Sequence, residues 1–267
     1  MPEQQPLARI FDAGAGDFER MAPSLWNPMG NALVAAADVK LDESVLDACC
    51  GGGSITVPAA QSAGPSAIVD AVDLSAELLE IAAAKAKTLS LENVSFSQSD
   101  VLGFRPDTQY DVVLCGYAVF FLPDMDAGVR HLASLLRSGG RLAFSTWAEG
   151  ALTDFTSALF RHCAAEGVQL PNTSESSRDN MLRINTAQKA SDWLQELGLK
   201  EVSAAHTSVP VLLSQDLAWS LVMGSPLRLL LPEGQDAAGR VRDAFLAELG
   251  EEYTLNADTL LVTAVKP

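Results

Sequence analysis

The stretch VLDACCGGGS (residues 45–54) runs from aliphatic residues through an aspartate and two adjacent cysteines into three consecutive glycines. A segment of this composition suits three kinds of site: a metal site, a redox-active cysteine pair, or a turn of bare backbone that holds a cofactor. Glycine favours the third, because it adopts positive φ angles without steric cost and lets a ligand approach the main chain closely.

The two interpretations based on cysteine are the weaker ones. Neighbouring residues of a strand point to opposite faces, so Cys49 and Cys50 are poorly placed to bind one metal ion. The chain has no CxxC pair, and a disulfide between adjacent cysteines is strained. We therefore expect no metal site, and we expect all four cysteines, including Cys115 and Cys163, to be reduced and to pack as small hydrophobic residues.

The backbone interpretation requires a strand, a tight turn and the start of a helix. VLDACC supplies the strand, GGG the turn and residues 54–63 the helix. An acidic residue at the end of the following strand would bind ribose hydroxyls, and Asp73 lies there. The dinucleotide fingerprint GxGxxG fits no register of the loop, and a GxxxxGK[ST] phosphate loop is absent, so NAD and nucleoside triphosphates are the weaker cofactor candidates.

Short apolar runs alternate with helix-like segments along the chain, the pattern of a parallel sheet covered by helices on both faces. We therefore predict an α/β, doubly wound fold. The predicted strands cover residues 44–50, 67–74, 93–100, 110–117, 140–147, 201–213 and 253–267. The predicted helices include residues 75–89 with Ser75 as N-cap, 124–140 with Gly139 as C-cap, and 186–199.

The composition limits the choice of partners. Eighteen basic residues against 34 acidic ones give a net charge of −16 without a basic cluster, which argues against nucleic acid. Apolar runs fall short of a membrane span, and the first residues do not resemble a secretory signal. We expect one domain over residues 1–267, a cytoplasmic location and a small-molecule substrate, while the oligomeric state stays open.

Several motifs together resemble one known family. VLDACCGGG looks like the VLDxGxGxG motif of class I S-adenosylmethionine-dependent methyltransferases, in their small-molecule, UbiE-like branch (methyltransferase type 11). The segments AVDLSAELLEIA, SQSDVLGF, YDVVLCGYAVFFLPD and LLRSGGRLAFSTW are similar to the motifs that follow it. Upstream, FDAGAGDFERMAPSLW resembles the helix that some small-molecule members fold over the cofactor.

The resemblance implies a layout for the chain and a set of cofactor-binding residues. It implies a Rossmann-like sheet of seven mostly parallel strands with an antiparallel last strand and a helical lid. Residues 1–40 would form an N-terminal helical cap, 41–147 the cofactor-binding half, and 148–185 and 214–250 lid insertions that select the substrate. The implied S-adenosylmethionine-binding residues are Asp47, Cys49, Gly51, Gly53, Asp73 at the ribose, Leu74, Asp100 at the adenine amino group, Val101, Gly116 and Tyr117.

The chain departs from the family pattern at two positions. Cys49 stands where the first glycine usually falls, which places a side chain near the methionine portion of the cofactor. Phe18 stands where related members often carry a tyrosine, which removes one hydroxyl contact. Asp47 is expected to organise the loop through hydrogen bonds to backbone amides.

Ligands bind at the carboxyl ends of the strands in open α/β sheets, which points to the residues that end the fourth and fifth predicted strands. The catalytic candidates are Tyr117, as a positioning or proton-accepting residue or as an aromatic wall, and His162, as a general base. The substrate-binding candidates are Phe18, Phe121, Trp147 and Trp219. We expect Phe120 in the core and His131 and His206 on the surface.

The expected reaction is transfer of a methyl group from S-adenosylmethionine to a small, partly hydrophobic acceptor through oxygen, nitrogen or carbon. Such a reaction requires no catalytic dyad, because the cofactor carries the activated methyl group. Two alternatives use the same sheet. One is a nicotinamide-dependent oxidoreductase, and the other is a protein that binds S-adenosylmethionine or its demethylated product without turnover.

Overall fold

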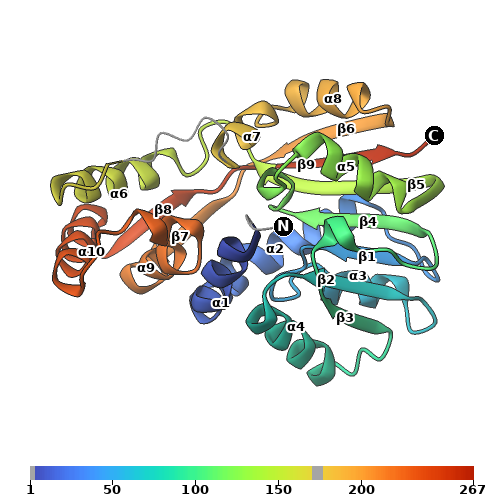
Figure 1. The fold of residues 1–267 in the computed structure, drawn as a ribbon, viewed down its shortest axis with the longest axis horizontal. Coiled ribbons are helices and arrows are strands. Elements are labelled where there is room, and N and C mark those ends of the chain that lie inside the picture. Colours follow the sequence, from blue (N-terminus) through green and yellow to red (C-terminus); the bar gives the residue numbers. More distant parts are fainter. Residues whose placement is uncertain (1–3, 170–176) are drawn as a thin grey trace.

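The computed structural model describes residues 4–169 and 177–267. Seven strands form one sheet in the order β3-β2-β1-β4-β5-β9-β6. Neighbouring strands run parallel except where β9 pairs with β5 and with β6. Helices cover both faces of this sheet (Figure 1). The predicted α/β fold with one antiparallel strand is therefore confirmed.

The elements follow one another along the chain with short connections. The strands are β1 (Val45–Ala48), β2 (Val69–Asp73), β3 (Val94–Gln98), β4 (Tyr110–Gly116), β5 (Leu136–Trp147), β6 (Lys200–Thr207), β7 (Pro210–Ser214), β8 (Glu252–Asn256) and β9 (Thr259–Val265). The α-helices are α1 (Gln4–Arg20), α2 (Asn27–Ala36), α3 (Thr56–Ala63), α4 (Ala76–Thr88), α5 (Met125–Ser134), α6 (Thr153–Ala165), α7 (Ser177–Arg183), α8 (Ala187–Glu196), α9 (Gln215–Met223) and α10 (Gln235–Leu249). Short turns of other helix types are η1 (Ala22–Trp26, a π-turn), η2 (Val101–Gly103), η3 (Val119–Phe121) and η4 (Pro226–Leu230).

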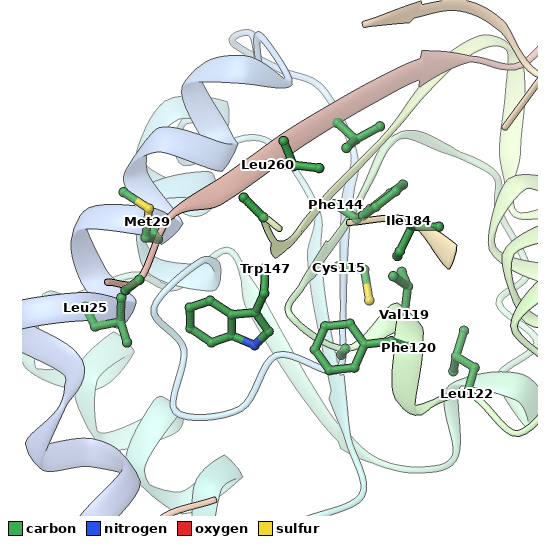
Figure 2. Close-up of a cluster of buried hydrophobic side chains, with 14 of the residues drawn as sticks. Leu25, Met29, Cys115, Val119, Phe120, Leu122, Phe144, Trp147, Ile184 and Leu260 are labelled. Atoms are coloured by element: carbon green, nitrogen blue, oxygen red, sulfur yellow. The ribbon is translucent and has the colours of Figure 1, made fainter. Parts of the chain in front are cut away.

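The central strands are buried on both faces because helices pack against each side. On β4, Val113 and Cys115 belong to the larger apolar cluster, whereas Val112 and Leu114 belong to the cluster on the opposite face. Figure 2 shows part of the larger cluster, in which Trp147 lies between residues of the N-terminal helices and Phe120. The prediction that Phe120 is a core residue is confirmed, since only 4% of it is exposed.

The helix prediction at residues 75–89 is confirmed, and the one at 124–140 is wrong at its end. Ser75 caps α4 by accepting a hydrogen bond from the Leu78 amide. Helix α5, in contrast, ends at Ser134, and β5 begins at Leu136, so Gly139 lies inside a strand. The cause is tertiary: Leu136 pairs with Tyr110, and the Gly139 amide donates to the carbonyl of Lys266. Pairing with neighbouring strands outweighs the local helical pattern.

Two segments predicted as single strands are each divided in two. Residues 201–213 contain β6 and β7, and residues 253–267 contain β8 and β9. The division falls where Asp258 accepts a hydrogen bond from the Val209 amide, and beyond it β7 and β8 pair only with each other. These two strands gather with α6, α9 and α10 at one end of the molecule (Figure 1).

Residues 170–176, within the predicted lid segment 148–185, lie outside the described residues. Within the described ranges, no helix combines the length and the apolar character that crossing a bilayer requires. A cytoplasmic location stays a prediction of the sequence.

Candidate active site

The glycine loop after β1 is shaped by residues with left-handed backbone. Gly51 has a φ of +52° and Gly53 one of +81°. Added to Gly53, a Cβ atom would lie 3.0 Å from the Cβ of Ala82, so the loop and α4 approach too closely for a side chain there. Cys49 adopts a φ of +59°, a conformation that costs a non-glycine residue energy. The turn therefore presents main chain at its glycines and begins with two thiol-bearing residues, Cys49 and Cys50.

Asp73 joins the end of β2 to this loop. Its Oδ2 accepts a hydrogen bond from the Gly51 amide at 2.8 Å, and its Oδ1 accepts one from the Ser75 amide at 2.9 Å. Burial raises the pKa of Asp73, and the same two amides oppose that shift. Each carboxylate oxygen has a second lone pair with which it can accept a further donor, such as a ribose hydroxyl.

Asp47 lies beneath the loop and is fully buried. Its Oδ2 accepts a hydrogen bond from the Thr56 hydroxyl at 2.6 Å, while Oδ1 has no hydrogen-bond partner within the described residues. Loss of hydration raises the pKa of Asp47 to about 7, with a contribution from the nearby charge of Asp73. The side chain therefore ties the loop to the start of α3 and leaves one acceptor atom unused.

Helix α1 crosses over the loop and is held there by polar contacts. Asp12 Oδ1 accepts a hydrogen bond from the Ser75 hydroxyl at 2.6 Å, at the N-terminus of α4. Further along α1, Glu19 pairs with Lys85 at 2.7 Å, and the same ammonium group donates to the Gly52 carbonyl at 2.8 Å. The helix is thus fastened to both elements that flank the expected cofactor position.

Six aromatic residues form a continuous cluster above the strand ends. Their rings come from α1, η1, η3 and the ends of β4 and β5, and they are Phe11, Phe18, Trp26, Tyr117, Phe121 and Trp147. The closest pairs are Tyr117 with Trp147, at 4.4 Å between ring centroids, and Phe18 with Trp26, at 4.9 Å. We call this set the aromatic cluster.

Phe18 links the aromatic cluster to the glycine loop. Its ring lies 3.5 Å from the position that a Cβ on Gly51 would occupy. Its carbonyl accepts a hydrogen bond from the indole of Trp26 at 2.9 Å. The apolar wall and the bare backbone of the loop are therefore neighbours, as a site joining a cofactor to a partly hydrophobic substrate requires.

Tyr117 has a strained backbone and an engaged hydroxyl. Its φ is +51°, rare outside glycine and typical of residues at functional sites. Because the Thr259 hydroxyl donates to the Ala257 carbonyl, the Tyr117 hydroxyl donates its proton to Thr259 Oγ1, at 2.7 Å. Burial raises the pKa of Tyr117 far above its usual range. This arrangement suits an aromatic wall or a positioning residue better than a base.

The remaining predicted cofactor residues lie at neighbouring strand ends. Asp100 accepts a hydrogen bond from the Leu102 amide at 2.9 Å and precedes the buried Val101 in η2. Leu74 follows β2 directly. At the end of β4, a Cβ on Gly116 would lie 2.3 Å from Ile55 Cδ1, so a side chain there would require Ile55 to move. Because β1 to β4 are parallel, the residues that follow these four strands all lie at the same, carboxyl end of the sheet.

Three predicted residues lie elsewhere or at the margin. His162 is on α6, where its Nε2 lies 2.8 Å from Glu248 Oε2 of α10, in the part of the molecule distant from the glycine loop (Figure 1). Trp219 is half-buried on α9 and packs against the larger apolar cluster. Phe121 contacts Phe11 edge to face at 6.1 Å.

The sequence interpretation named Phe18 on α1 but missed Phe11 and Asp12 on the same helix. Phe11 and Phe18 are seven residues apart, which puts them on one face of a helix, and this spacing was a usable signal. Asp12 and Lys85 carried no such signal, because their contacts depend on how α1 crosses α4. His131, expected at the surface, is half-buried and hydrogen-bonded to the Val101 carbonyl at 3.0 Å.

The four cysteines are unpaired, three of them buried and Cys49 half-buried. Across residues 4–169 and 177–267, no three His, Cys, Asp or Glu side chains converge in a metal-binding group.

Comparison with known proteins gives this arrangement a family. Residues 45–140, from β1 into β5, match the family described as "Methyltransferase domain". Residues 45–140 therefore resemble a methyltransferase domain. This domain carries the glycine loop, Asp73 and Asp100, whereas α1, β6 to β9 and the helices around them lie outside the matched residues.

Curated relatives resemble this methyltransferase domain over about half of the chain. Aklanonic acid methyltransferase DauC from Streptomyces sp. strain C5 is 32% identical over 145 residues, 54% of this chain and 66% of the relative. Demethylmenaquinone methyltransferase from Lactococcus lactis is 36% identical over 144 residues, 52% of this chain and 57% of the relative. The chain thus spans less than two thirds of the length of either protein.

Solved structures share the fold of the methyltransferase domain at low identity. The YcgJ protein from Bacillus subtilis has a TM-score of 0.56 at 20% identity and covers 89% of this chain and 98% of its own. The [4+2]-cyclase SpnF has a TM-score of 0.57 at 17% identity, over 90% of this chain and 81% of its own. At such identities the likeness shows the fold alone, and the second protein shows that this fold also serves another reaction.

Proposed function

We propose that the protein transfers a methyl group from S-adenosylmethionine to a small, partly hydrophobic molecule. The observation that carries the proposal is the hydrogen bond from the Gly51 amide to Asp73 Oδ2 at 2.8 Å, inside the segment that matches the methyltransferase domain. This hydrogen bond joins a bare backbone turn to the carboxylate that we propose as the ribose ligand.

The residues at this edge suit the separate parts of the cofactor. Asp73 and Leu74 would hold the ribose, and Asp100 and Val101 the adenine. Two features make the loop compatible with the methionine portion: glycine backbone at Gly51 and Gly53, and the unused acceptor atom of buried Asp47. Cys49, Gly116 and Tyr117 would line the same portion.

The cofactor supplies an activated methyl group on a sulfonium. The protein's part is to hold the acceptor in line with that group and to exclude water, and orientation of this kind lowers barriers by about 7–11 kcal/mol. The aromatic cluster beside the loop provides apolar walls for the acceptor, with Phe18, Phe121 and Trp147 as the proposed contacts. Trp219 lies on α9, within the predicted lid segment 214–250, and would contact the acceptor from there.

Tyr117 is proposed as a wall and positioning residue because its proton is committed to Thr259. His162 pairs with Glu248 on α10 and is therefore left out of the proposed reacting centre. An acceptor that ionises readily would need no base from the protein, and a neutral amine would attack through its lone pair, after which its ammonium product would release a proton to water.

A ligand-binding experiment tests the cofactor assignment. A ligand that binds only the native state stabilises it by about 2.7 kcal/mol at one hundred times its dissociation constant. S-adenosylhomocysteine should therefore raise the melting temperature of the wild-type protein, and NADH should leave it unchanged. Stabilisation by NADH alone would instead support the oxidoreductase.

The Asp73→Asn variant sharpens this test. It keeps the shape of the side chain but removes the charge, and it should lose most of the stabilisation by S-adenosylhomocysteine. Asp107→Asn, at an exposed loop residue, is the matched control and should respond like wild type. The melting temperature without ligand shows whether Asp73→Asn folds, and an unchanged response in that variant would remove the ribose assignment.

Turnover separates an enzyme from a silent binder. The protein is incubated with S-adenosylmethionine carrying a labelled methyl group and with a panel of phenols, amines and quinones. Transfer of label to a member of the panel supports the proposal. Tight binding of the cofactor without transfer across a broad panel would favour the non-catalytic alternative.

A further inference from the structure

The turn η2, which follows the edge strand β3, has few hydrogen bonds of its own. The Gly103 amide donates to the Asp100 carbonyl at 2.9 Å, the Leu102 amide donates to the Asp100 side chain at 2.9 Å, and the Phe104 amide donates to the Val101 carbonyl at 3.2 Å. A turn of three residues at the edge of a sheet needs contacts from other elements to keep one conformation. Since Asp100 and Val101 are proposed to meet the adenine, those contacts bear on cofactor binding.

Helix α5 supplies the main one through His131. The Nε2 atom of His131 lies 3.0 Å from the Val101 carbonyl oxygen. A carbonyl only accepts hydrogen bonds, so Nε2 carries the proton and donates it. The interaction fixes the main chain of the residue directly after Asp100.

Arg105 holds the other end of the same turn. Its Nη1 donates to the carbonyls of Leu102 and Phe104 at 2.9 Å and 2.8 Å, and it lies 3.1 Å from His131 Nε2. Partial burial lowers the pKa of His131, and the charge of Arg105 lowers it further, while Asp100 opposes the shift. Arg105 has only N–H donors, so when Nε2 donates to Val101 the 3.1 Å approach of Nη1 to Nε2 is a contact and not a hydrogen bond.

Close packing of α5 against η2 accompanies this hydrogen bond. A Cβ on Gly128 would lie 2.6 Å from Leu122 Cδ1 and 3.4 Å from Leu102 Cδ2. Gly128 and His131 are three residues apart, so they share one face of the helix. The glycine lets α5 pack closely on Leu122, while Leu102 of η2 lies at ordinary van der Waals distance from the same position.

We infer that His131 is a positioning residue for the cofactor, holding η2 so that Asp100 and Val101 meet the adenine ring. The inference rests on the proposed function, because it concerns the same cofactor site. His131 itself does not touch the adenine. It acts through the main chain of Val101.

The test compares two ligands that differ only at the adenine. S-adenosylhomocysteine carries an amino group on the ring, and S-inosylhomocysteine carries a carbonyl oxygen there. The affinity of each is measured by isothermal titration calorimetry for wild type, His131→Ala, His131→Gln and His206→Ala. Glutamine retains an N–H donor, and His206 is an exposed histidine on β6 that serves as the matched control.

Wild type and His206→Ala should prefer the adenosyl ligand. His131→Ala should bind S-adenosylhomocysteine about ten-fold more weakly, the equivalent of one hydrogen bond, and should lose much of the preference. His131→Gln should recover part of both. A merely structural role would weaken both ligands by one factor and leave the preference intact.

Three results would overturn the inference: an unchanged affinity in His131→Ala, an equal loss for both ligands, or no preference in wild type. Failure of the proposed function looks different, because wild type itself would then not bind S-adenosylhomocysteine. Melting temperatures of the unliganded variants confirm that each one folds.

Discussion

The ionisation of a single residue, Asp47 next to the glycine loop, makes the stability of the fold depend on pH. With a pKa raised from 3.8 to about 7, its folded form keeps a proton between about pH 4 and pH 7 that the unfolded chain releases. Stability contributed by this group is therefore full below about pH 4, falls as pH rises through that window, and is level above about pH 7. The total change is on the order of 4 kcal/mol.

Replacing Asp47 by asparagine should remove this dependence. Urea unfolding at about pH 5 and about pH 8 measures the free energy of unfolding of the variant and of wild type. We expect the loss of stability between the two pH values to be smaller in Asp47→Asn, and Asp107→Asn to behave like wild type. Equal losses in all three proteins would contradict the raised pKa.

Cys49 stores backbone strain, because its φ of +59° suits glycine better than a residue with a side chain. Comparing Cys49→Gly with Cys49→Ala separates strain from the loss of the thiol, which both variants share. The glycine variant should be more stable than the alanine variant by about 1 kcal/mol, as measured by chemical denaturation. An alanine variant of equal or greater stability would show that the loop relaxes.

At the residue scale, the sequence indicated Asp73 and the loop glycines because their spacing follows from one strand–turn–helix unit. It gave no indication of Thr259 as the partner of Tyr117, since β9 lies more than a hundred residues away along the chain. The same holds for His131: its helical position was readable, but its contact with Val101 depends on where η2 lies.

At the scale of elements, α1 is held on the loop by the pair Glu19–Lys85, with exposed side-chain fractions of 30% and 25%. Partial exposure limits the worth of such a pair to about 1 kcal/mol. In Glu19→Gln, hydrogen–deuterium exchange should become faster in α1 and stay unchanged in the sheet. Arg161→Gln, which breaks the pair with Glu248 on α10, is the control and should leave α1 unaffected. Unaltered exchange in α1 would show that its apolar contacts suffice.

Among the elements, helices with a clear cap and stripe were predicted well, as α4 shows. The wrong predictions concern segments whose secondary structure depends on partners distant in the sequence. The segment at 136–140 became strand because Leu136 and Gly139 find partners in Tyr110 and Lys266. The last strand was divided for the same reason, since β8 leaves the main sheet to pair with β7.

At the scale of the whole molecule, α1 and α9 join the methyltransferase domain to the part of the chain beyond it. A Cβ on Gly224, directly after α9, would lie 2.4 Å from the Phe18 amide nitrogen. Ser220 also donates to Asp17 Oδ1 at 2.9 Å. The two helices meet backbone to backbone, so a displacement of α9 would move α1 and, with it, Phe18.

Gly224→Ala should therefore destabilise the protein by about 1–3 kcal/mol and weaken S-adenosylhomocysteine binding. Gly239→Ala, inside α10 with no atom within 4 Å of the added Cβ, is the matched control. It should stabilise slightly, because alanine favours helix over glycine by about 0.5–1 kcal/mol. Melting temperatures and calorimetry with the ligand check both. If Gly224→Ala changed neither the melting temperature nor the affinity for the ligand, α1 and α9 would be able to move apart without a loss of stability.

The sequence by itself determined the class of fold, the glycine loop and the acid that serves it, because these depend on local spacing and on the alternation of buried strands with helices. The tertiary structure alone decided the contacts around the site: Asp12 with Ser75 before α4, Lys85 with Gly52 of the loop, Thr259 with Tyr117, and His131 with Val101 of η2. Those contacts join residues far apart in the chain, and their geometry is set by how helices cross and strands pair. Local sequence patterns do not encode such crossings, since many arrangements of the same elements satisfy the same periodicity.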